Sequence, residues 1–263
     1  MALGPDSSSG PLALDVSDLT VTYGAKAAVQ GVSFSINQGE IFGLLGPNGA
    51  GKTSTLSAIE GLVKPVHGSI HVDGIDARAR PAEARARIGV QLQATSFQKE
   101  LTIRELVRLY SGLYGASRSK SAADEQLATV HLDEEADKRF GQLSGGQQKR
   151  LALLIATVHD PSLLLLDEPT AGLDPQSRRS LWERIEHMRQ IGRSVLVTTH
   201  SMEEAQSVCD RVAIVDDGKI VSLDTPAGLI AKHRDDPQVK SVARGEVTLE
   251  DVFIGLTGSK LRD

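Results

Sequence analysis

A glycine-rich stretch that ends in a lysine and a threonine is the first feature of this sequence able to do chemistry. GPNGAGKT, residues 46–53, has four residues between Gly46 and Gly51, and Lys52 and Thr53 follow directly. In such a loop the glycines turn backbone N–H groups toward phosphates, the lysine adds a positive charge, and the hydroxyl suits a magnesium ion. We predict a phosphate-binding loop for a nucleotide and magnesium, made of Gly46, Pro47, Asn48, Gly49, Ala50, Gly51, Lys52, Thr53 and Ser54.

Two adjacent acids follow the apolar run LLLL. An enzyme with such a loop needs one acid near magnesium and a second group that orients the attacking water. Successive residues of a strand point to opposite sides, so Asp167 and Glu168 can take different roles. We predict that Asp167 holds the metal and that Glu168 is the general base or positions the water. The alternative is that either acid caps a turn or helix beginning at Pro169.

Two further polar side chains follow strand-like segments. His200 ends SVLVTTH, from which it can reach a γ-phosphate or the attacking water. The next residues, Ser201 to Glu204, have the spacing of a capping box, which begins a helix. Gln93, in IGVQLQ, is expected to touch the metal-bound water and so to act at the metal and in catalysis. Gln91 competes with it, because the choice depends on strand register.

A second helix start with unusual composition occurs at LSGGQQKR. Ser144 and Gln147 again have capping-box spacing, so a well-started helix is the simplest interpretation. Gly145 and Gly146, however, each cost about 1 kcal/mol relative to alanine inside a helix. That cost indicates close approach of the backbone to something, and a helix N-terminus with exposed N–H groups binds anions such as a γ-phosphate.

Hydrophobic periodicity indicates which elements position these groups. Short alternating runs near the N-terminus predict antiparallel strands, and continuous apolar runs separated by helices predict a parallel sheet with its reactive groups at the carboxyl ends of the strands. We therefore predict an α/β P-loop NTPase fold with a mainly parallel sheet core, an N-terminal antiparallel β lobe and a helical sub-lobe at about 94–160. The helix at 102–115 is expected to have one apolar face, made of Ile103, Leu106, Val107, Tyr110, Leu113 and Tyr114.

Composition excludes several classes of protein. The 263 residues are 40% hydrophobic and carry a formal net charge of −5, with acids and bases interspersed, so no nucleic-acid surface is expected. No apolar run approaches the about 18 residues of a membrane-spanning helix, and the start lacks a secretory signal, so we expect a cytoplasmic protein. The arginines of ARARPAEARARIG are expected to be a solvated helix face. Cys209, the single cysteine, is expected to be a small buried side chain.

Together the motifs resemble one family. GPNGAGKT, LSGGQ, LLLLDE, AGLD and the final histidine of SVLVTTH occur in the order found in the nucleotide-binding domain of ATP-binding cassette (ABC) transporters. LSGGQ discriminates, because other P-loop enzymes lack it. The resemblance covers residues 12–229, which would form the ABC ATPase domain, between a flexible tail at 1–11 and a short C-terminal extension at 230–263.

The resemblance also implies roles for single residues. Tyr23 would stack on the adenine of ATP, although without the family a strand-end tyrosine would be the preferred interpretation. Gln93 would link the magnesium site to the helical lobe, and His200 would act as the γ-phosphate switch. Asp174, in AGLD, would lie across a dimer interface. AGLD has Ala171 where serine is commoner, which removes no functional group.

The resemblance further implies that the site is shared between two subunits. Ser144, Gly145, Gly146 and Gln147 would contact ATP held by the 46–53 loop of another ATPase subunit, in a homodimer or a heterodimer. A separate membrane subunit, the permease, would bind beside the 102–115 helix and the segment after Gln93. The protein would then act at the cytoplasmic face of the membrane, with no other membrane contact.

The direction of transport and the chief alternative complete the sequence-based hypothesis. The ending SLDTPAGLIAKH and VTLEDVFIGLTG resembles that of ABC-2 type exporters, the subgroup that includes drug and antibiotic exporters. The alternative is a soluble ABC ATPase that acts on ribosomes or DNA. Such proteins typically carry two cassettes, a long coiled coil or a basic arm, and none is visible here. A nucleotide kinase or GTPase has no use for LSGGQ.

Overall fold

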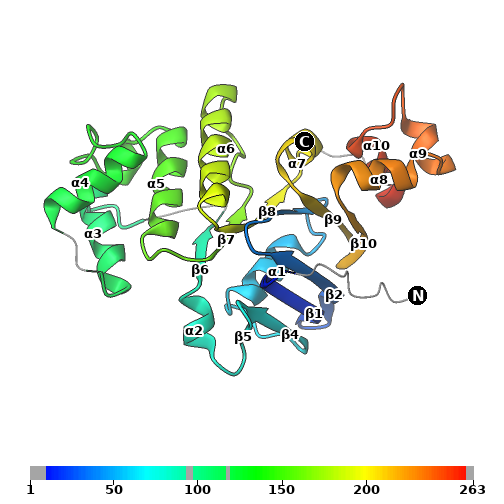
Figure 1. The fold of residues 1–263 in the computed structure, drawn as a ribbon, viewed down its shortest axis with the longest axis horizontal. Coiled ribbons are helices and arrows are strands. Elements are labelled where there is room, and N and C mark those ends of the chain that lie inside the picture. Colours follow the sequence, from blue (N-terminus) through cyan, green and yellow to red (C-terminus); the bar gives the residue numbers. More distant parts are fainter. Residues whose placement is uncertain (1–9, 93–96, 117–118, 259–263) are drawn as a thin grey trace.

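The computed structural model describes residues 10–92, 97–116 and 119–258. Within them the strands form two sheets, of six and of four strands (Figure 1). The larger sheet has the spatial order β10 (Lys219–Asp224), β9 (Arg211–Asp216), β3 (Ile41–Leu45), β8 (Ser194–Thr199), β7 (Leu163–Asp167) and β6 (Ile88–Gln91). The smaller sheet has the order β2 (Lys26–Asn37), β1 (Leu12–Tyr23), β4 (His67–Val72) and β5 (Ile75–Asp76).

The larger sheet is parallel except for β10, which pairs antiparallel with β9. Every residue of β3, β7 and β8 is buried, because helices cover both faces of the sheet and each strand is apolar on both sides. Leu45 pairs with Thr199, and Asp167 pairs with Thr198, so these three strands end at the same edge. The carboxyl ends of β3, β7 and β8 therefore bring together the phosphate loop, the acid pair and His200, and the predicted P-loop NTPase fold is confirmed.

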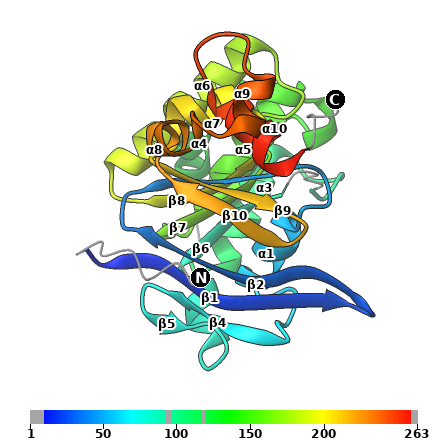
Figure 2. The same cartoon turned by 90° about the vertical axis from the view of Figure 1, so that its right-hand side faces the viewer.

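The smaller sheet is the antiparallel lobe expected near the N-terminus. β1 pairs with β2 on one side and with β4 on the other. Helix α1 (Lys52–Ile59) packs between the two sheets: Leu56 and Ile59 share a core with Leu14 of β1 and Phe42 of β3. Figure 2 shows the long β1 and β2 running beneath the larger sheet. This arrangement holds α1 firmly at the end of the phosphate loop.

A group of helices on one side of the larger sheet has its own core. These elements are α3 (Ile103–Leu113), α4 (Lys120–Thr129), the 3-10 helix η1 (Phe140–Gln142) and α5 (Gly145–Thr157) (Figure 1). Ile103, Leu106 and Val107 of α3 are buried in this core as predicted. The prediction was wrong for the last turn of α3, where Leu113 is 70% and Tyr114 49% exposed.

The last turn of α3 lies outside the core that α3 forms with α4 and α5. That core contains Ile103, Leu106 and Val107 but neither Leu113 nor Tyr114. Instead the ring of Tyr114 stacks on the ring of His159, with centroids 3.8 Å apart and planes 6° from parallel. Periodicity predicts which side chains share a face, but it does not predict where the neighbouring helices stop.

The other helices lie near the remaining face of the larger sheet or beside its edge. They are α2 (Pro81–Arg85), α6 (Pro175–Gln190), α7 (Met202–Val208), α8 (Pro226–His233), α9 (Pro237–Val242) and α10 (Leu249–Thr257). Leu229, Val239 and Phe253 of the last three helices are buried in one cluster with Met202 and Ala205 of α7. The C-terminal helices thus pack against the helix that follows His200.

Two minor expectations agree with the structure. The arginines around α2 are exposed, as a solvated helix face requires. Cys209 is buried directly after α7, and burial raises the pKa of its thiol far above the usual range, which keeps it unreactive. In the described part of the chain, no helix combines the length and apolarity needed to cross a membrane.

Candidate functional site

The phosphate loop connects β3 to α1 and is held close to two other strands. A Cβ atom on Gly46 would lie 2.4 Å from the carbonyl oxygen of Val215, and one on Gly51 would lie 2.4 Å from that of Ala28. Gly51 also has φ of 103°, which strains any other residue. No side chain caps the start of α1. Its first N–H groups are therefore available to an anion, as the sequence predicted.

Lys52 lies beneath this loop and is only 6% exposed. Its Nζ donates hydrogen bonds to the carbonyl oxygens of Gly46, at 2.6 Å, and Pro47, at 3.1 Å. Burial lowers the pKa of Lys52, while the negative charges of Glu168 and Asp167 act in the opposite direction. The ammonium is thus fixed inside the curve of the loop, where an outer phosphate would meet it.

The two acids after LLLL are held in different places by the end of β7. Asp167 is 5% exposed and accepts hydrogen bonds from the hydroxyls of Thr53, at 3.2 Å, and Thr198, at 2.5 Å. Glu168 has φ of 45°, so the chain turns away from the strand there. Its N–H donates to the Thr198 hydroxyl at 3.0 Å. Thr198 therefore holds both acids.

His200 lies beside the second acid. Its Nδ1 is 3.4 Å from Oε1 of Glu168, and its side chain is 56% exposed while that of Glu168 is 10% exposed. The structure thus brings together the two groups that the sequence proposed for the γ-phosphate and its attacking water. Gln93 lies outside the described residues. Its competitor Gln91 ends β6, is 1% exposed, and has no hydrogen-bond partner for its amide among the described residues.

Residues 144–147, which we call the Ser144 turn, begin α5 in the helical lobe, and Ser144 is exposed. Its capping box is complete: the Ser144 hydroxyl accepts from the N–H of Gln147, and Oε1 of Gln147 accepts from the N–H of Ser144. The Gln147 amide also donates to Glu135. The hydrogen bonds described for Ser144 and Gln147 all join residues of the helical lobe.

Part of the glycine composition of this turn has an explanation within the chain. A Cβ on Gly146 would lie 2.7 Å from Oγ of Ser177, while nothing lies within 4 Å of one on Gly145. Ser177 belongs to the first turn of α6, where Asp174 accepts its N–H at 3.0 Å. The Ser177 hydrogen bonds hold the pKa of Asp174 below its usual range. The Ser144 turn therefore lies close to residues 174–177 at the start of α6, which we call the Asp174 turn.

Sequence reasoning missed three residues around the acid pair. Thr198 ends a strand with two threonines, which is a weak signal. Glu60 follows α1, is 7% exposed, and its pKa is raised to about 7 by burial and by the charge of Asp167. Lys149 of α5 is partly buried, and burial lowers its pKa while Asp167 and Glu168 oppose the shift. Nothing in the sequence distinguishes Glu60 or Lys149 from surface residues.

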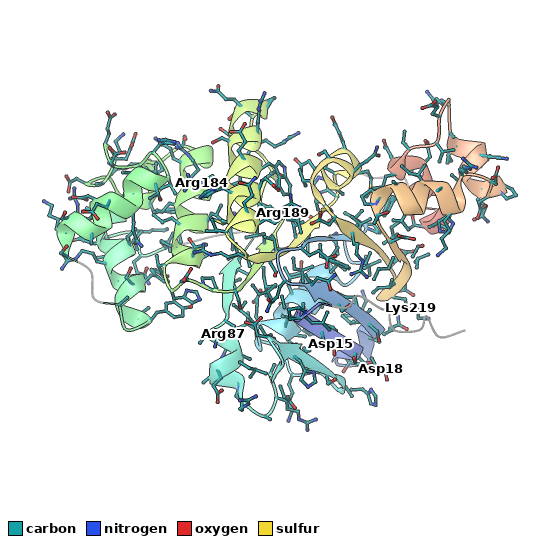
Figure 3. The ribbon with its side chains drawn as sticks, viewed as in Figure 1. Asp15, Asp18, Arg87, Arg184, Arg189 and Lys219 are labelled. Atoms are coloured by element: carbon teal, nitrogen blue, oxygen red, sulfur yellow. The ribbon has the colours of Figure 1, made fainter. Side chains whose placement is uncertain are left out.

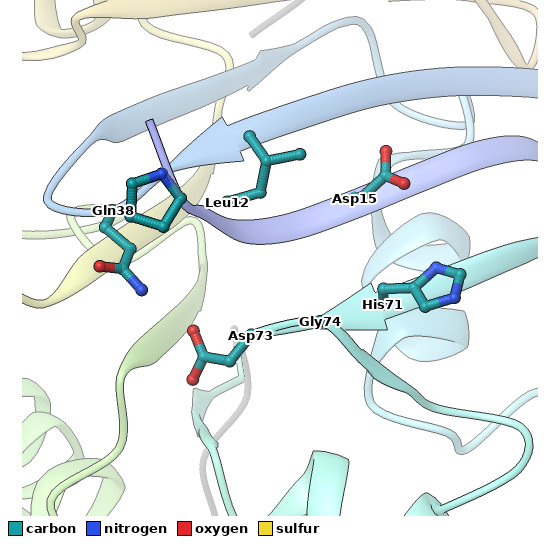
Figure 4. A pocket seen from close by; sticks show the side chains of 7 residues that line it. Leu12, Asp15, Gln38, His71, Asp73 and Gly74 are labelled. Carbon is teal, nitrogen blue, oxygen red and sulfur yellow. The ribbon is translucent and has the colours of Figure 1, made fainter. Parts of the chain in front are cut away.

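Tyr23 and a surface pocket both belong to the antiparallel lobe. Tyr23 ends β1 with its ring 52% exposed. A pocket of about 440 Å³ lies elsewhere in the antiparallel lobe, where Asp15, His71 and Asp73 line it together with Pro11, Leu12, Gln38 and Gly74 (Figure 4). It contains no motif residue. Figure 3 likewise shows Asp15 and Asp18 on the small sheet, away from Arg184 and Arg189 of α6.

Comparison with known proteins decides the family. The model of the ABC transporter family matches residues 29–171, more than half of the chain. The chain belongs to the ABC transporter family. The Nod factor export ATP-binding protein I of Burkholderia orbicola (strain AU 1054) is 41% identical over 219 residues, which cover 82% of this chain and 72% of that protein. The protein of that name from Rhizobium etli is 41% identical over 220 residues, covering 83% and 70%.

Solved structures agree with this family. An ATP-binding subunit of an ABC transporter has a TM-score of 0.79 and 28% identity, covering 92% of this chain and 98% of that one. A cassette solved as a dimer in a post-hydrolysis state with ADP and Pi has a TM-score of 0.73 and 28% identity, covering 81% and 98%. The prediction of an ATP-binding, ATP-hydrolysing subunit of an ABC transporter is thus confirmed. Subunits of this family bind nucleotides, generally dimerise, and generally pair with membrane subunits.

Proposed function

We propose that this ABC ATPase works with a second ATPase subunit, a copy of itself or a related chain, and that each ATP is bound between the two. One observation carries the proposal. The phosphate loop, Asp167 and Glu168 form a mostly buried cluster with His200 beside it, whereas the Ser144 turn is exposed and the hydrogen bonds described for it stay within the helical lobe. An exposed helix N-terminus that begins with a glycine suits the γ-phosphate of ATP bound to another chain.

Magnesium fits the oxygen ligands at the end of β7. Mg²⁺ is usually bound by one or two carboxylates together with substrate phosphates and waters. The Thr53 hydroxyl and the Asp167 carboxylate, 3.2 Å apart, would hold the ion, and we assign Gln93 to its bound water. When bound, the metal neutralises charge on the outer phosphates.

The protein's own groups supply the remaining steps. Lys52 and the N–H groups of the loop orient the phosphates, and Tyr23 stacks on adenine. Glu168 accepts a proton from the water that attacks the γ-phosphorus, or orients that water. His200, beside Glu168, contacts the γ-phosphate and distinguishes ATP from ADP. Asp174 contacts the partner subunit.

ATP binding then closes the pair and hydrolysis opens it, and the difference in affinity between the two states drives a separate membrane subunit. That permease docks beside α3 and the segment after Gln93, at the cytoplasmic face of the membrane, and determines the substrate. The division into a tail at 1–11, an ATPase domain at 12–229 and a C-terminal extension at 230–263 remains part of this proposal. The relatives' names, which specify export, favour outward transport.

Mixing two inactive variants tests the shared site. Glu168→Gln lacks the base, and Ser144→Arg blocks the helix start. In a mixed pair, the loop and Glu168 of the Ser144→Arg chain face the intact Ser144 of the other chain, which restores one site. Random pairing would place that site in half of the dimers, so phosphate release from the mixture should exceed that of either variant alone and reach at most about a quarter of the wild-type rate.

The same experiment has clear contrary outcomes. If the mixture stays as inactive as its components, or if wild-type protein remains a single chain at its full rate of hydrolysis, the proposal of a shared site is wrong.

Co-purification from membranes tests the proposed membrane partner. A hydrophobic membrane subunit supports the exporter, whereas ribosomes or DNA would support the alternative ATPase.

A further inference from the structure

Glu204 has a buried carboxylate whose hydrogen-bond partners differ from those that the sequence pattern predicts. The spacing Ser201 to Glu204 predicts a reciprocal capping box at the start of α7. In the structure only half of it forms: the Ser201 hydroxyl accepts from the N–H of Glu204, while the N–H of Ser201 donates to the Thr199 hydroxyl. Glu204 is 8% exposed, so its carboxylate must be satisfied by other groups.

The first partner of the carboxylate is Thr170. Its hydroxyl donates to Oε2 of Glu204 at 2.8 Å, and both residues are buried. Thr170 lies in the turn between Glu168 and Asp174. The N–H of Ala171 donates to the carbonyl oxygen of Glu168, so Thr170 is inside a tight turn that begins at the proposed base.

The second partner is Arg178 on α6. Its Nε is 3.2 Å from Oε1 of Glu204, and its NH2 group lies 3.5 Å from the carbonyl oxygen of Leu173. Arg178 stands one helical turn after Asp174, whose carbonyl oxygen accepts its N–H. The two oxygens of Glu204 thus bind both ends of the segment that carries Asp174.

The backbone of Glu204 is in turn connected to His200. The Ser201 cap fixes the first turn of α7, and Met202 and Ala205 are buried against the sheet and the C-terminal helices. Glu204 therefore lies about one helical turn after His200 on a well-packed helix.

We propose that Glu204 is a positioning residue that keeps the Asp174 turn and His200 in a fixed relation. Contact of His200 with the γ-phosphate and contact of Asp174 with the second subunit then occur as one event. This inference rests on the proposed function. Glu204 touches neither nucleotide nor partner and acts through Thr170, Arg178 and the start of α7.

Variants of Thr170 provide the sharpest test. Thr170→Val removes the hydroxyl and leaves Oε2 of Glu204 without this donor, so we expect kcat for ATP to fall about tenfold while KM stays within about twofold. Thr170→Ser keeps the hydroxyl and should restore kcat to within about twofold of wild type. A purely structural role for Thr170 would not separate kcat from KM in this way.

Arg178→Met tests the other oxygen and has a matched control. It should raise the ATP concentration needed for half-maximal pairing about fivefold or more, without changing the affinity of a single chain for ATP. Arg179→Met removes an exposed ion pair to Glu183 on the same helix and should leave pairing unchanged. The double variant Thr170→Val with Glu204→Gln should lose less kcat than the two single variants predict together, because both substitutions break the same contact.

Several results would overturn the inference. They are an unchanged kcat in folded Thr170→Val, failure of Thr170→Ser to recover, and an equal shift in Arg178→Met and Arg179→Met. Wild-type protein separates the two levels of hypothesis. If wild type pairs with ATP while these variants behave as wild type, only the role of Glu204 is wrong. If wild type itself does not pair, the proposed function fails first.

Discussion

The two halves of the proposed ATP site differ in how much of their structure lies within one chain. The half with Lys52 and Asp167 is buried, and its polar groups bond one another or the loop. The half at Ser144 is exposed, and the hydrogen bonds described for it start α5 or join Gln147 to Glu135 in the same lobe. We therefore expect ATP hydrolysis to depend on the first half. The second half is expected to act only when it contacts ATP bound to another chain. Changes in the first should affect turnover and stability, and changes in the second should affect pairing.

The largest effect is expected for Glu168→Gln. The amide keeps the volume of the side chain but cannot accept a proton, so steady-state ATP hydrolysis should fall by about a hundredfold or more. ATP binding should persist, and pairs should accumulate because hydrolysis no longer separates them. Phosphate release and sedimentation measure the two effects. Glu203→Gln, at an exposed neighbour of Glu204, is the control and should hydrolyse ATP as wild type does. Turnover of Glu168→Gln at the wild-type rate would remove Glu168 from its role.

The next effect is expected for Ser144→Arg, which tests the exposed half alone. A bulky cation at the helix start should block ATP-dependent pairing while the single chain binds ATP with unchanged affinity. Sedimentation with and without ATP measures pairing. Ser119→Arg is a matched control, because Ser119 caps α4 in the same lobe through the N–H of Ala122. If both variants pair as wild type does, the two halves do not differ as proposed.

The last effect concerns stability without nucleotide and no change in activity, and it is expected at Glu60, whose pKa depends on Asp167 of the buried half. Its pKa is raised from 4.5 to about 7, chiefly by burial and then by the charge of Asp167. Between these two values the unfolded chain releases the proton while the folded chain keeps it, so the free energy of unfolding falls as pH rises. Below about pH 4.5 the carboxyl is protonated in both states and this cost disappears.

Glu60→Gln removes that ionisation. Relative to wild type, it should gain about 2 to 4 kcal/mol of unfolding free energy at about pH 8 and nearly nothing at about pH 4.5. Urea unfolding without nucleotide at several pH values measures the difference. A gain that does not vary with pH would mean that Glu60 has no raised pKa. Burial would then impose no electrostatic cost on this half of the site.

Local patterns were sufficient for most of the fold. The runs at 163–167 and 194–199 are short, apolar and bounded by polar residues, and they form buried parallel strands. Ser144 and Gln147 form the predicted capping box because both partners lie within one helical turn. The exposed end of α3 was not predictable, because its exposure depends on which other segments the folded chain packs beside it.

In the candidate site, too, local patterns showed some residues and missed those that depend on distant segments. Asp167, Glu168 and His200 could be selected as candidates because each ends or follows a strand that is visible in the sequence. Thr198, which bonds both acids, and Glu60, whose pKa Asp167 raises, were missed because their partners are distant in the chain. Glu204 was assigned to a local cap and instead bonds Thr170 and Arg178.

By itself, the sequence of this protein determined its elements, its phosphate loop and its family motifs, because these depend on residues within a turn or a strand of one another. Only the tertiary structure decided which buried polar groups bond across elements. A buried carboxylate must find a partner wherever the packed chain provides one, and that choice is made between segments far apart in the sequence.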